Sequence, residues 1–180
     1  MCGDVVSRVM RRIAYVGLGS NLASSAGEPA ATVAAATDAL ATIGEIVGRS
    51  QLFRTEAVGD EDQPAFVNAV AGLCTDEEPE KLLERLLRIE RSFGRNRATG
   101  IAKGPRTLDL DLLLMGDLIY ESPTLVVPHP ELARRRFVLA PLAEIAPELL
   151  HPVLKRSVRE LLDELPDEGP NRRSAVRHIR

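Results

Sequence analysis

The sequence has no tryptophan, only two tyrosines and four phenylalanines, and only two cysteines among its 180 residues. Cys2 lies in a polar N-terminal segment and Cys74 in an apolar stretch, so we expect no disulfide framework, and a reducing cytoplasm fits. No apolar run approaches the roughly 18–20 residues that span a bilayer, and no apolar segment follows the N-terminal arginines as it does in a secretory signal. We therefore expect a cytoplasmic protein that does not bind membranes.

The charge is nearly balanced, with a formal net charge of −3, which argues against wholesale nucleic-acid binding. The composition, 44% hydrophobic and 27% charged, is that of a globular protein. Cations nevertheless gather in two places: residues 95–106 contain four cations and no acid, and Arg134–Arg136 form a second basic island. Such islands suit a compact polyanion, although solvated surface charge is the alternative for either island taken alone. We expect a monomer that acts on small molecules.

The order of expected elements indicates an α+β fold. Strands are predicted at 13–19, 46–55, 66–75 and 107–114, and two helices, each opened by a proline and closed by a glycine, at 29–43 and 79–93. The order βαββαβ is that of a ferredoxin-like unit. A short strand near 118–120, a proline-punctuated segment over 123–152 and a helix near 158–165 follow. We therefore predict a single domain over 13–166, between a flexible tail at 1–12 and a polar tail at 167–180.

The stretch GPRTLDLDLLL (104–114) places two carboxylates in a leucine-rich strand. Side chains alternate along a strand, so Leu108, Leu110, Leu112 and Leu114 are predicted to face the core, with Asp109 and Asp111 on the other side. Two like charges this close raise each other's pKa unless a cation intervenes. Mg²⁺ is the natural cation, because it takes carboxylate oxygens and shares its remaining positions with water and phosphate. A simply solvated strand face is the alternative.

Common nucleotide-binding motifs are missing. GLGSNL (17–22) follows a strand but lacks the third glycine of a Rossmann fingerprint, and no P-loop sequence occurs. Any nucleotide is therefore expected to be held by side chains and magnesium. The glycines Gly17 and Gly19 are expected to shape the strand end, and Asn21 to cap the turn.

Five blocks in a fixed order resemble the 6-hydroxymethyl-7,8-dihydropterin pyrophosphokinase family over roughly residues 13–152. They are YVGLGSNL, FRTEAVGDEDQPAFVNAV, RIERSFGRNR, GPRTLDLDLLL and VPHPELARRRFVLAPL. The resemblance implies a ferredoxin-like α+β fold and a role in folate biosynthesis. It also implies transfer of pyrophosphate from ATP to the pterin by attack at the β-phosphorus, with AMP as co-product and two Mg²⁺ ions as cofactors.

The resemblance also assigns residues to the ATP side of the site. Asp109 and Asp111 match the magnesium-binding acids, and Arg95 and Arg106 are expected to assist the chemical step. The family pattern places the nucleotide near Glu90, Arg97, Arg106, Leu112, His129 and Arg135. A guanidinium suits this task because its planar fork makes paired bonds to phosphate oxygens. The alternatives are surface charge for each arginine, a structural histidine, and an ion pair of Glu90 with Arg97 or Arg91.

On the pterin side, the resemblance assigns Thr55, the backbone of Val58, Asn68, and the rings of Phe66 and Phe137. A flat heteroaromatic ligand needs a flat slot and a few well-placed donors and acceptors. Rings are scarce in this sequence, so two of them near the expected site favour stacking over ordinary core packing.

Two other functions remain to be separated from this one. Some nucleotidyl transferases and cyclases also set paired aspartates on a ferredoxin-like sheet, but that hypothesis does not explain Thr55, Phe66 and Asn68. A ferredoxin-like module that binds RNA usually displays aromatic residues on its strands, and Asp109 and Asp111 carry the wrong charge for that surface.

Overall fold

The computed structural model describes residues 11–56, 63–96, 104–168, 171–172 and 176–179. Its strands are β1 (Arg12–Ser20), β2 (Glu45–Arg49), β3 (Phe53–Thr55), β4 (Phe66–Thr75), β5 (Asp109–Met115), β6 (Tyr120–Glu121), β7 (Val126–Val127) and β8 (Val176–His178). Its helices are α1 (Pro29–Ala39), α2 (Pro79–Ser92), α3 (Arg136–Ile145) and α4 (Val158–Glu164), with short 3₁₀ turns at Leu40–Thr42 and Leu132–Arg134. The predicted α+β class is confirmed.

A single antiparallel sheet organises the described part of the chain. Its strand order is β5-β1-β4-β3-β8, and β2 pairs with β4 beyond the end of β3. Counting β2 and β3 together as the second strand of the unit, the order is fourth, first, third, second. This is the order that a ferredoxin-like βαββαβ unit requires, so the predicted architecture is confirmed. β6 and β7 form a separate two-stranded hairpin.

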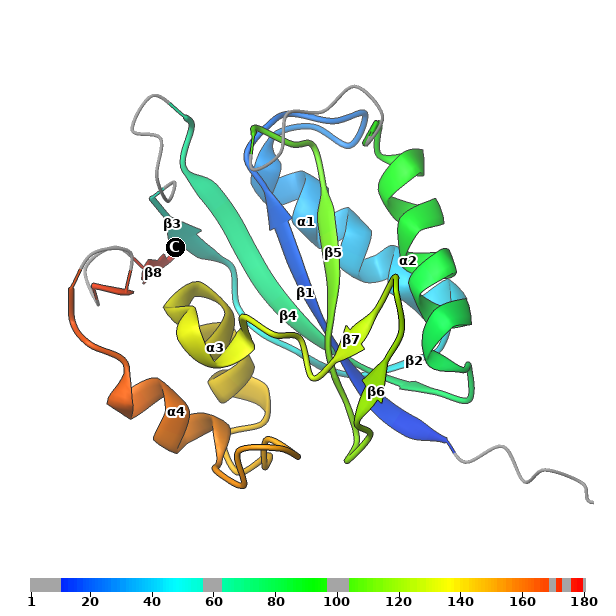
Figure 1. Cartoon of the computed structure of the whole chain (residues 1–180). Coiled ribbons are helices and arrows are strands. Elements are labelled where there is room, and N and C mark those ends of the chain that lie inside the picture. Colours follow the sequence, from blue (N-terminus) through cyan, green and yellow to red (C-terminus); the bar gives the residue numbers. More distant parts are fainter. Residues whose placement is uncertain (1–10, 57–62, 97–103, 169–170, 173–175, 180) are drawn as a thin grey trace, which may run out of the picture.

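Two layers of helix cover the two faces of this sheet (Figure 1). Leu82 and Leu86 of α2 and Val33 of α1 pack in one core with Leu110 and Leu112 of β5. Helices α3 and α4 form a second core on the other face, where Leu139 of α3 is fully buried. In Figure 1, α1 passes behind the strands, whereas α3 lies to the left of the lower part of β4 and is not behind it. Each strand therefore sends alternate side chains into two different environments.

The predicted strand over 46–55 is wrong, because it is two strands. Arg49 of β2 faces Ala71, and Phe53 of β3 faces Asn68. The segment from Arg49 to Phe53 is therefore one residue longer than the segment of β4 that it faces. Ser50 occupies the break: its N–H donates to the Val70 carbonyl oxygen at 2.9 Å, and its hydroxyl accepts from the Val70 N–H at 2.9 Å. The extra residue bends the chain, as in a β-bulge.

A bulge in β5 corrects the predicted direction of Leu114. Val16 faces Leu112 but Tyr15 faces Leu114, so Leu113 is an extra residue on β5. The alternation shifts there, and Leu114 packs in the core under α3 and α4 rather than with Leu110 and Leu112. Asp109 and Asp111 precede the bulge and keep their predicted side.

Two elements near the C-terminus were not predicted from the sequence. Helix α3 lies in the proline-punctuated segment and contains Pro141, a residue that usually breaks a helix interior. Strand β8 lies in the segment predicted as a polar tail and pairs with β3. The predicted helix near 158–165 is confirmed as α4, which Ser157 and Glu160 open with a capping box. Among the described residues, no helix is long and apolar enough to cross a membrane.

Candidate active site

Strand register brings distant residues together at one end of the sheet. Gly19 of β1 faces Asp109 on one neighbour and Asn68 on the other. Paired residues in adjacent strands point to the same face, so the carboxylate and the amide share the α3 side of the sheet. Gly19 between them keeps this row open, since a Cβ there would lie 3.1 Å from Asn68 Oδ1. Antiparallel pairing thus assembles a polar row from three strands.

A cavity of about 440 Å³ opens over this row. Eight residues that the sequence assigned to the site line it: Thr55, Phe66, Asn68, Arg106, Asp109, Asp111, Arg135 and Phe137. They come from β3, β4, β5, the segment before β5 and the start of α3. The cavity therefore joins the residues assigned to the two substrates.

Two arginines hold the carboxylate of Asp109. Arg106 Nη1 lies 2.7 Å from Oδ2, and Arg95 Nη2 lies 3.4 Å from Oδ1. All three side chains are largely buried, with 17–22% of each exposed, so these pairs are screened less than surface pairs. Cations therefore offset the charge of Asp109, one of the two acids, in the fold.

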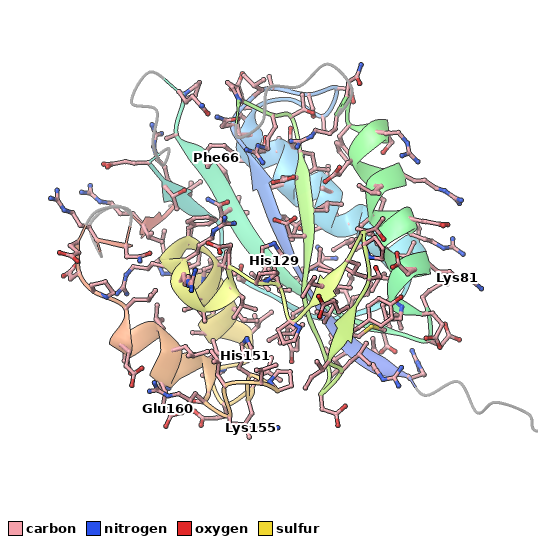
Figure 2. All side chains as sticks on the ribbon, in the orientation of Figure 1. Phe66, Lys81, His129, His151, Lys155 and Glu160 are labelled. Atoms are coloured by element: carbon pink, nitrogen blue, oxygen red, sulfur yellow. The ribbon has the colours of Figure 1, made fainter. Side chains whose placement is uncertain are left out.

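Each of the two predicted ring residues lies next to an arginine. The guanidinium carbon of Arg106 lies 5.6 Å from the centre of the Phe66 ring. On the other wall, the guanidinium carbon of Arg135 lies 5.7 Å from the Phe137 ring centre. Both distances fall in the cation–π range. Figure 2 labels Phe66 at the start of β4. The residues assigned to phosphate and to pterin are therefore in direct contact on both sides of the cavity.

The polar floor of the cavity is itself hydrogen-bonded. Asn68 Nδ2 donates to Thr55 Oγ1 at 2.7 Å, and both residues are buried. This bond orients the amide, so that Asn68 Oδ1 is placed beside Gly19. Asn68 and Thr55 thus present a fixed donor–acceptor pair to the cavity.

Glu90 and Arg95 lie at the outer edge of β5, outside the cavity lining. Glu90 is 1% exposed, and its Oε1 accepts from the Leu110 N–H at 2.8 Å. Arg95 Nη1 donates to the Leu108 carbonyl oxygen at 3.3 Å. These two side chains form hydrogen bonds with backbone groups of β5, which is an edge strand. Unpaired backbone groups on an edge strand can otherwise pair with a strand of another chain. The two side chains connect the C-terminal end of α2 to the acidic strand.

His129 follows the cis peptide bond between Val127 and Pro128. Its N–H donates to the Leu113 carbonyl oxygen at 2.9 Å, and its Nδ1 accepts from the Glu131 N–H at 3.1 Å. Burial, and secondarily the charge of Arg135, lowers the pKa of His129, so the ring is neutral at pH 7 with its proton on Nε2. Figure 2 shows it between β7 and α3.

Three of the residues assigned to the site have no side chain placed in the cavity. Leu112 is 2% exposed and its side chain packs in the core under α1 and α2. Val58 and Arg97 lie outside the described residues. Their assigned roles stay predictions.

The donor set fits magnesium. Asp109 and Asp111 both line the cavity, and their carboxylate oxygens are the ligand type that Mg²⁺ takes. Among the described residues, no group of three or more His, Cys, Asp or Glu side chains could enclose an ion. A site with two acidic side chains suits an ion that also binds phosphate and water, because Mg²⁺ is rarely held in an all-protein cage.

The family model of 7,8-dihydro-6-hydroxymethylpterin-pyrophosphokinase (HPPK) matches residues 15–147. This match covers most of the chain. The chain belongs to the HPPK family. The predicted family is therefore confirmed, and the protein is a pyrophosphokinase of the folate pathway.

Curated HPPK relatives support the same membership. The chain is 46% identical over 160 residues to the 2-amino-4-hydroxy-6-hydroxymethyldihydropteridine pyrophosphokinase of Pseudomonas aeruginosa, covering 88% of this chain and 94% of that protein. It is 38% identical over 160 residues to the folic acid synthesis protein fol1 of Schizosaccharomyces pombe, but it spans only 21% of that longer protein. The HPPK unit therefore occurs both alone and within larger chains.

Solved HPPK structures share the fold. A Plasmodium falciparum HPPK-DHPS variant solved with pterin and p-hydroxybenzoate matches with a TM-score of 0.68 at 15% identity. The match covers 97% of this chain and 48% of that one. At this identity, the likeness shows the fold alone.

Sequence reasoning gave too small a role to Asn21 in this HPPK chain. Its Oδ1 accepts from the Arg106 N–H at 2.7 Å, and its Nδ2 donates to the Pro64 carbonyl oxygen at 3.2 Å. The buried amide thus ties the segment before β4 to the segment before β5. The turn signal GSN was visible in the sequence, but its partners are 43 and 85 residues away. Glu131, which pairs with Arg135, and Asn171, which lines the cavity, had no sequence signal.

Proposed function

We propose that this chain transfers pyrophosphate from ATP to the hydroxymethyl group of 6-hydroxymethyl-7,8-dihydropterin and releases AMP. The observation that carries the proposal is the shared cavity, where Asp109, Asp111 and Arg106 meet Thr55 and Asn68. The name of the Pseudomonas aeruginosa relative points to the same substrate. A site with acids, guanidinium groups, an oriented amide and two rings suits a phosphate donor beside a flat heteroaromatic acceptor.

Thr55 and Asn68 would recognise the edge of the pterin. The Asn68 amide donates one N–H to Thr55 Oγ1. Its Oδ1 can therefore accept a hydrogen bond from the ligand, and the Thr55 hydroxyl can donate one to it. Gly19 leaves room beside Oδ1 that any larger side chain would fill. Phe66 and Phe137 would stack on the two faces of the ring, and the backbone of Val58 remains a proposed contact.

The arginines would hold the triphosphate. Arg106 and Arg95 both contact the Asp109 carboxylate, and Arg135 lines the same cavity, so three guanidinium groups are available to the polyphosphate. In the proposed step, the pterin hydroxyl oxygen bonds to the β-phosphorus and loses its proton to water, while the bond from that phosphorus to the bridging oxygen of AMP breaks and AMP leaves. Arginines placed there stabilise the charge that moves to the leaving group. Glu90, His129, Leu112 and Arg97 are proposed contacts of the nucleotide.

Asp109 and Asp111 would hold the two Mg²⁺ ions. Bound Mg²⁺ neutralises phosphate charge and fixes the in-line geometry of phosphoryl-type transfer. The two carboxylates project from one strand, so both can face one polyphosphate. Asp109 already has cationic partners on both oxygens, which supports a role in binding positive charge.

Nucleotide analysis tests the proposal. The purified chain is incubated with ATP and Mg²⁺, with and without the hydroxymethyl-dihydropterin, and the products are separated. We expect AMP to form only when pterin is added, in equal amounts with the pterin diphosphate. Release of inorganic pyrophosphate without pterin would instead identify a nucleotidyl transferase or cyclase.

A further inference from the structure

The first turn of α3 carries two residues of the proposed site but lacks a local cap. Arg135 precedes the helix and Phe137 is its second residue. Within the described residues, the side chain of Arg135 makes no capping bond, and no acidic residue lies in the first turn. Helix starts leave backbone N–H groups without intrahelical partners, and three consecutive arginines add positive charge to the positive end of the helix dipole. This turn therefore needs support from elsewhere in the fold.

Asn171 provides that support from the C-terminal segment. Its Oδ1 accepts from the Arg136 N–H at 3.0 Å, and its Nδ2 donates to the Arg134 carbonyl oxygen at 3.0 Å. In return, the buried Arg136 side chain donates from Nε to the Asn171 carbonyl oxygen at 2.5 Å and from Nη2 to the Leu165 carbonyl oxygen at 3.2 Å. Arg136 was grouped with the basic island, but its guanidinium serves this contact. One asparagine thus brackets the start of α3 from both sides.

The same segment also holds the opposite wall of the cavity. Strand β8 pairs with β3, so that Val176 faces Thr55 and His178 faces Phe53. His178 lies 4.3 Å from the Phe53 ring centre, and its Nε2 lies 3.4 Å from Glu144 Oε1 on α3. In Figure 1, β8 lies beside β3. Residues 171–172 and 176–179 therefore join the two elements that carry Thr55 and Phe137, and they lie beyond the family match at 15–147.

We infer that Asn171 is a positioning residue for the pterin side of the site, acting through the first turn of α3. The inference rests on the proposed function. Asn171 lines the cavity, but its two side-chain bonds go to the backbone on either side of Arg135. Without them, the first turn frays, and Phe137 and Arg135 lose their fixed place in the cavity that Phe66 and Arg106 also line. A helix cap supplied by a distant segment thereby sets the width of the ligand slot.

Three variants test this in the full-length chain. Asn171→Ala removes both bonds, whereas Asn171→Asp keeps the acceptor for the Arg136 N–H and removes the donor. Arg172→Ala alters the adjacent exposed residue and serves as the matched control. Pterin is titrated by calorimetry in the presence of Mg²⁺ and a non-hydrolysable ATP analogue, and kcat and KM for pterin are measured alongside. We expect Asn171→Ala to weaken pterin binding about tenfold, Asn171→Asp less than threefold, and Arg172→Ala not at all.

A double-mutant cycle with Phe137→Ala separates positioning from general destabilisation. If Asn171 acts through this turn, Asn171→Ala should change pterin affinity less than twofold in the Phe137→Ala background, because the ring it positions is already gone. A full tenfold effect in that background would overturn the inference. So would parental pterin affinity in Asn171→Ala, or equal losses in Asn171→Ala and Asn171→Asp. A parent chain that binds no pterin and makes no AMP overturns the proposed function as well, whereas an active parent with any of these results overturns the inference alone.

Discussion

On the side of β5 that faces α1 and α2, Leu110 and Leu112 are almost fully buried, whereas Asp109 and Asp111 on the other side line the cavity. The two sets alternate along the same strand. Helices cover the leucines completely, whereas both aspartates face the cavity and Asp109 pairs with two arginines. The difference shows that one strand can anchor a core and present charge, provided that the two sheet faces are covered to different extents.

Two carboxylates next to β5, Glu90 away from the cavity and Asp109 in it, have different kinds of partner. Glu90 is buried and accepts from a backbone N–H of β5, while Asp109 is held by two arginines at the cavity. The first arrangement satisfies a backbone group that water cannot reach. The second places charge where a ligand can meet it. The comparison predicts that loss of Glu90 weakens the fold and loss of Asp109 weakens the chemistry.

The largest expected effect is on turnover. Asp109→Ala and Asp111→Ala should each lower kcat about a thousandfold or more, because each would remove a proposed ligand of Mg²⁺ worth several kcal/mol in the transition state. AMP formation at saturating substrates measures this, and thermal unfolding should stay close to that of the parent. Asp117→Ala removes an exposed carboxylate just after the same strand and is the matched control. Near-normal turnover by Asp109→Ala would refute the metal assignment.

The next effect is on stability and belongs to the buried carboxylate. Glu90→Ala should lower the free energy of unfolding by about 1–3 kcal/mol, because the Leu110 N–H loses its acceptor in a buried place. Urea unfolding measures the change. Glu84→Ala on the exposed side of α2 should stay within about 0.5 kcal/mol of the parent. If Glu90→Ala and Glu84→Ala lower the free energy of unfolding by the same amount, the hydrogen bond from Leu110 to Glu90 does not stabilise the fold.

Two phenylalanines on opposite sides of the sheet sharpen the comparison further. Phe66→Ala should weaken pterin binding about tenfold, because stacking on a flat ring is lost. Phe93 packs against the core under α1 and α2, so Phe93→Ala should reduce stability and leave pterin affinity unchanged. Calorimetric titration and thermal unfolding of both variants separate the two roles. An unchanged pterin affinity in Phe66→Ala would assign that ring to packing alone.

The smallest effect is a pH dependence on the α4 side. Burial lowers the pKa of His151, whose Nδ1 accepts from the Val153 and Leu154 N–H groups at 3.3 and 3.2 Å. A histidine with a lowered folded-state pKa stabilises the fold above its unfolded pKa of about 6.5, and stability falls as the pH drops below that value. His151→Asn keeps an acceptor but does not titrate, so its unfolding free energy should fall less between pH 7.5 and pH 5. Equal slopes for parent and variant would exclude this contribution.

Much of the fold could be predicted from local signals, and the reasons are visible in particular residues. Pro29 and Pro79 open α1 and α2 as expected, and alternation in β5 separates Asp109 from Leu110. The bulges at Val47 and Leu113 and the break after Ser50 were missed because one extra residue leaves no mark on a hydrophobic pattern. Helix α3 was missed because Pro141 and the arginines at its start contradict the usual helix signals, and Asn171 supplies the cap from 35 residues away.

By itself, the sequence determined the family, the βαββαβ order and the chemical types gathered for the site, because these depend on short motifs and on periodicity. Only the tertiary structure decided that Asp109, Gly19 and Asn68 stand in one row. It also decided that Asn21 joins two segments and that the C-terminal segment holds both β3 and α3. The physical reason is that strand register and the partners of buried polar groups depend on packing between segments far apart in the chain, which no local pattern records.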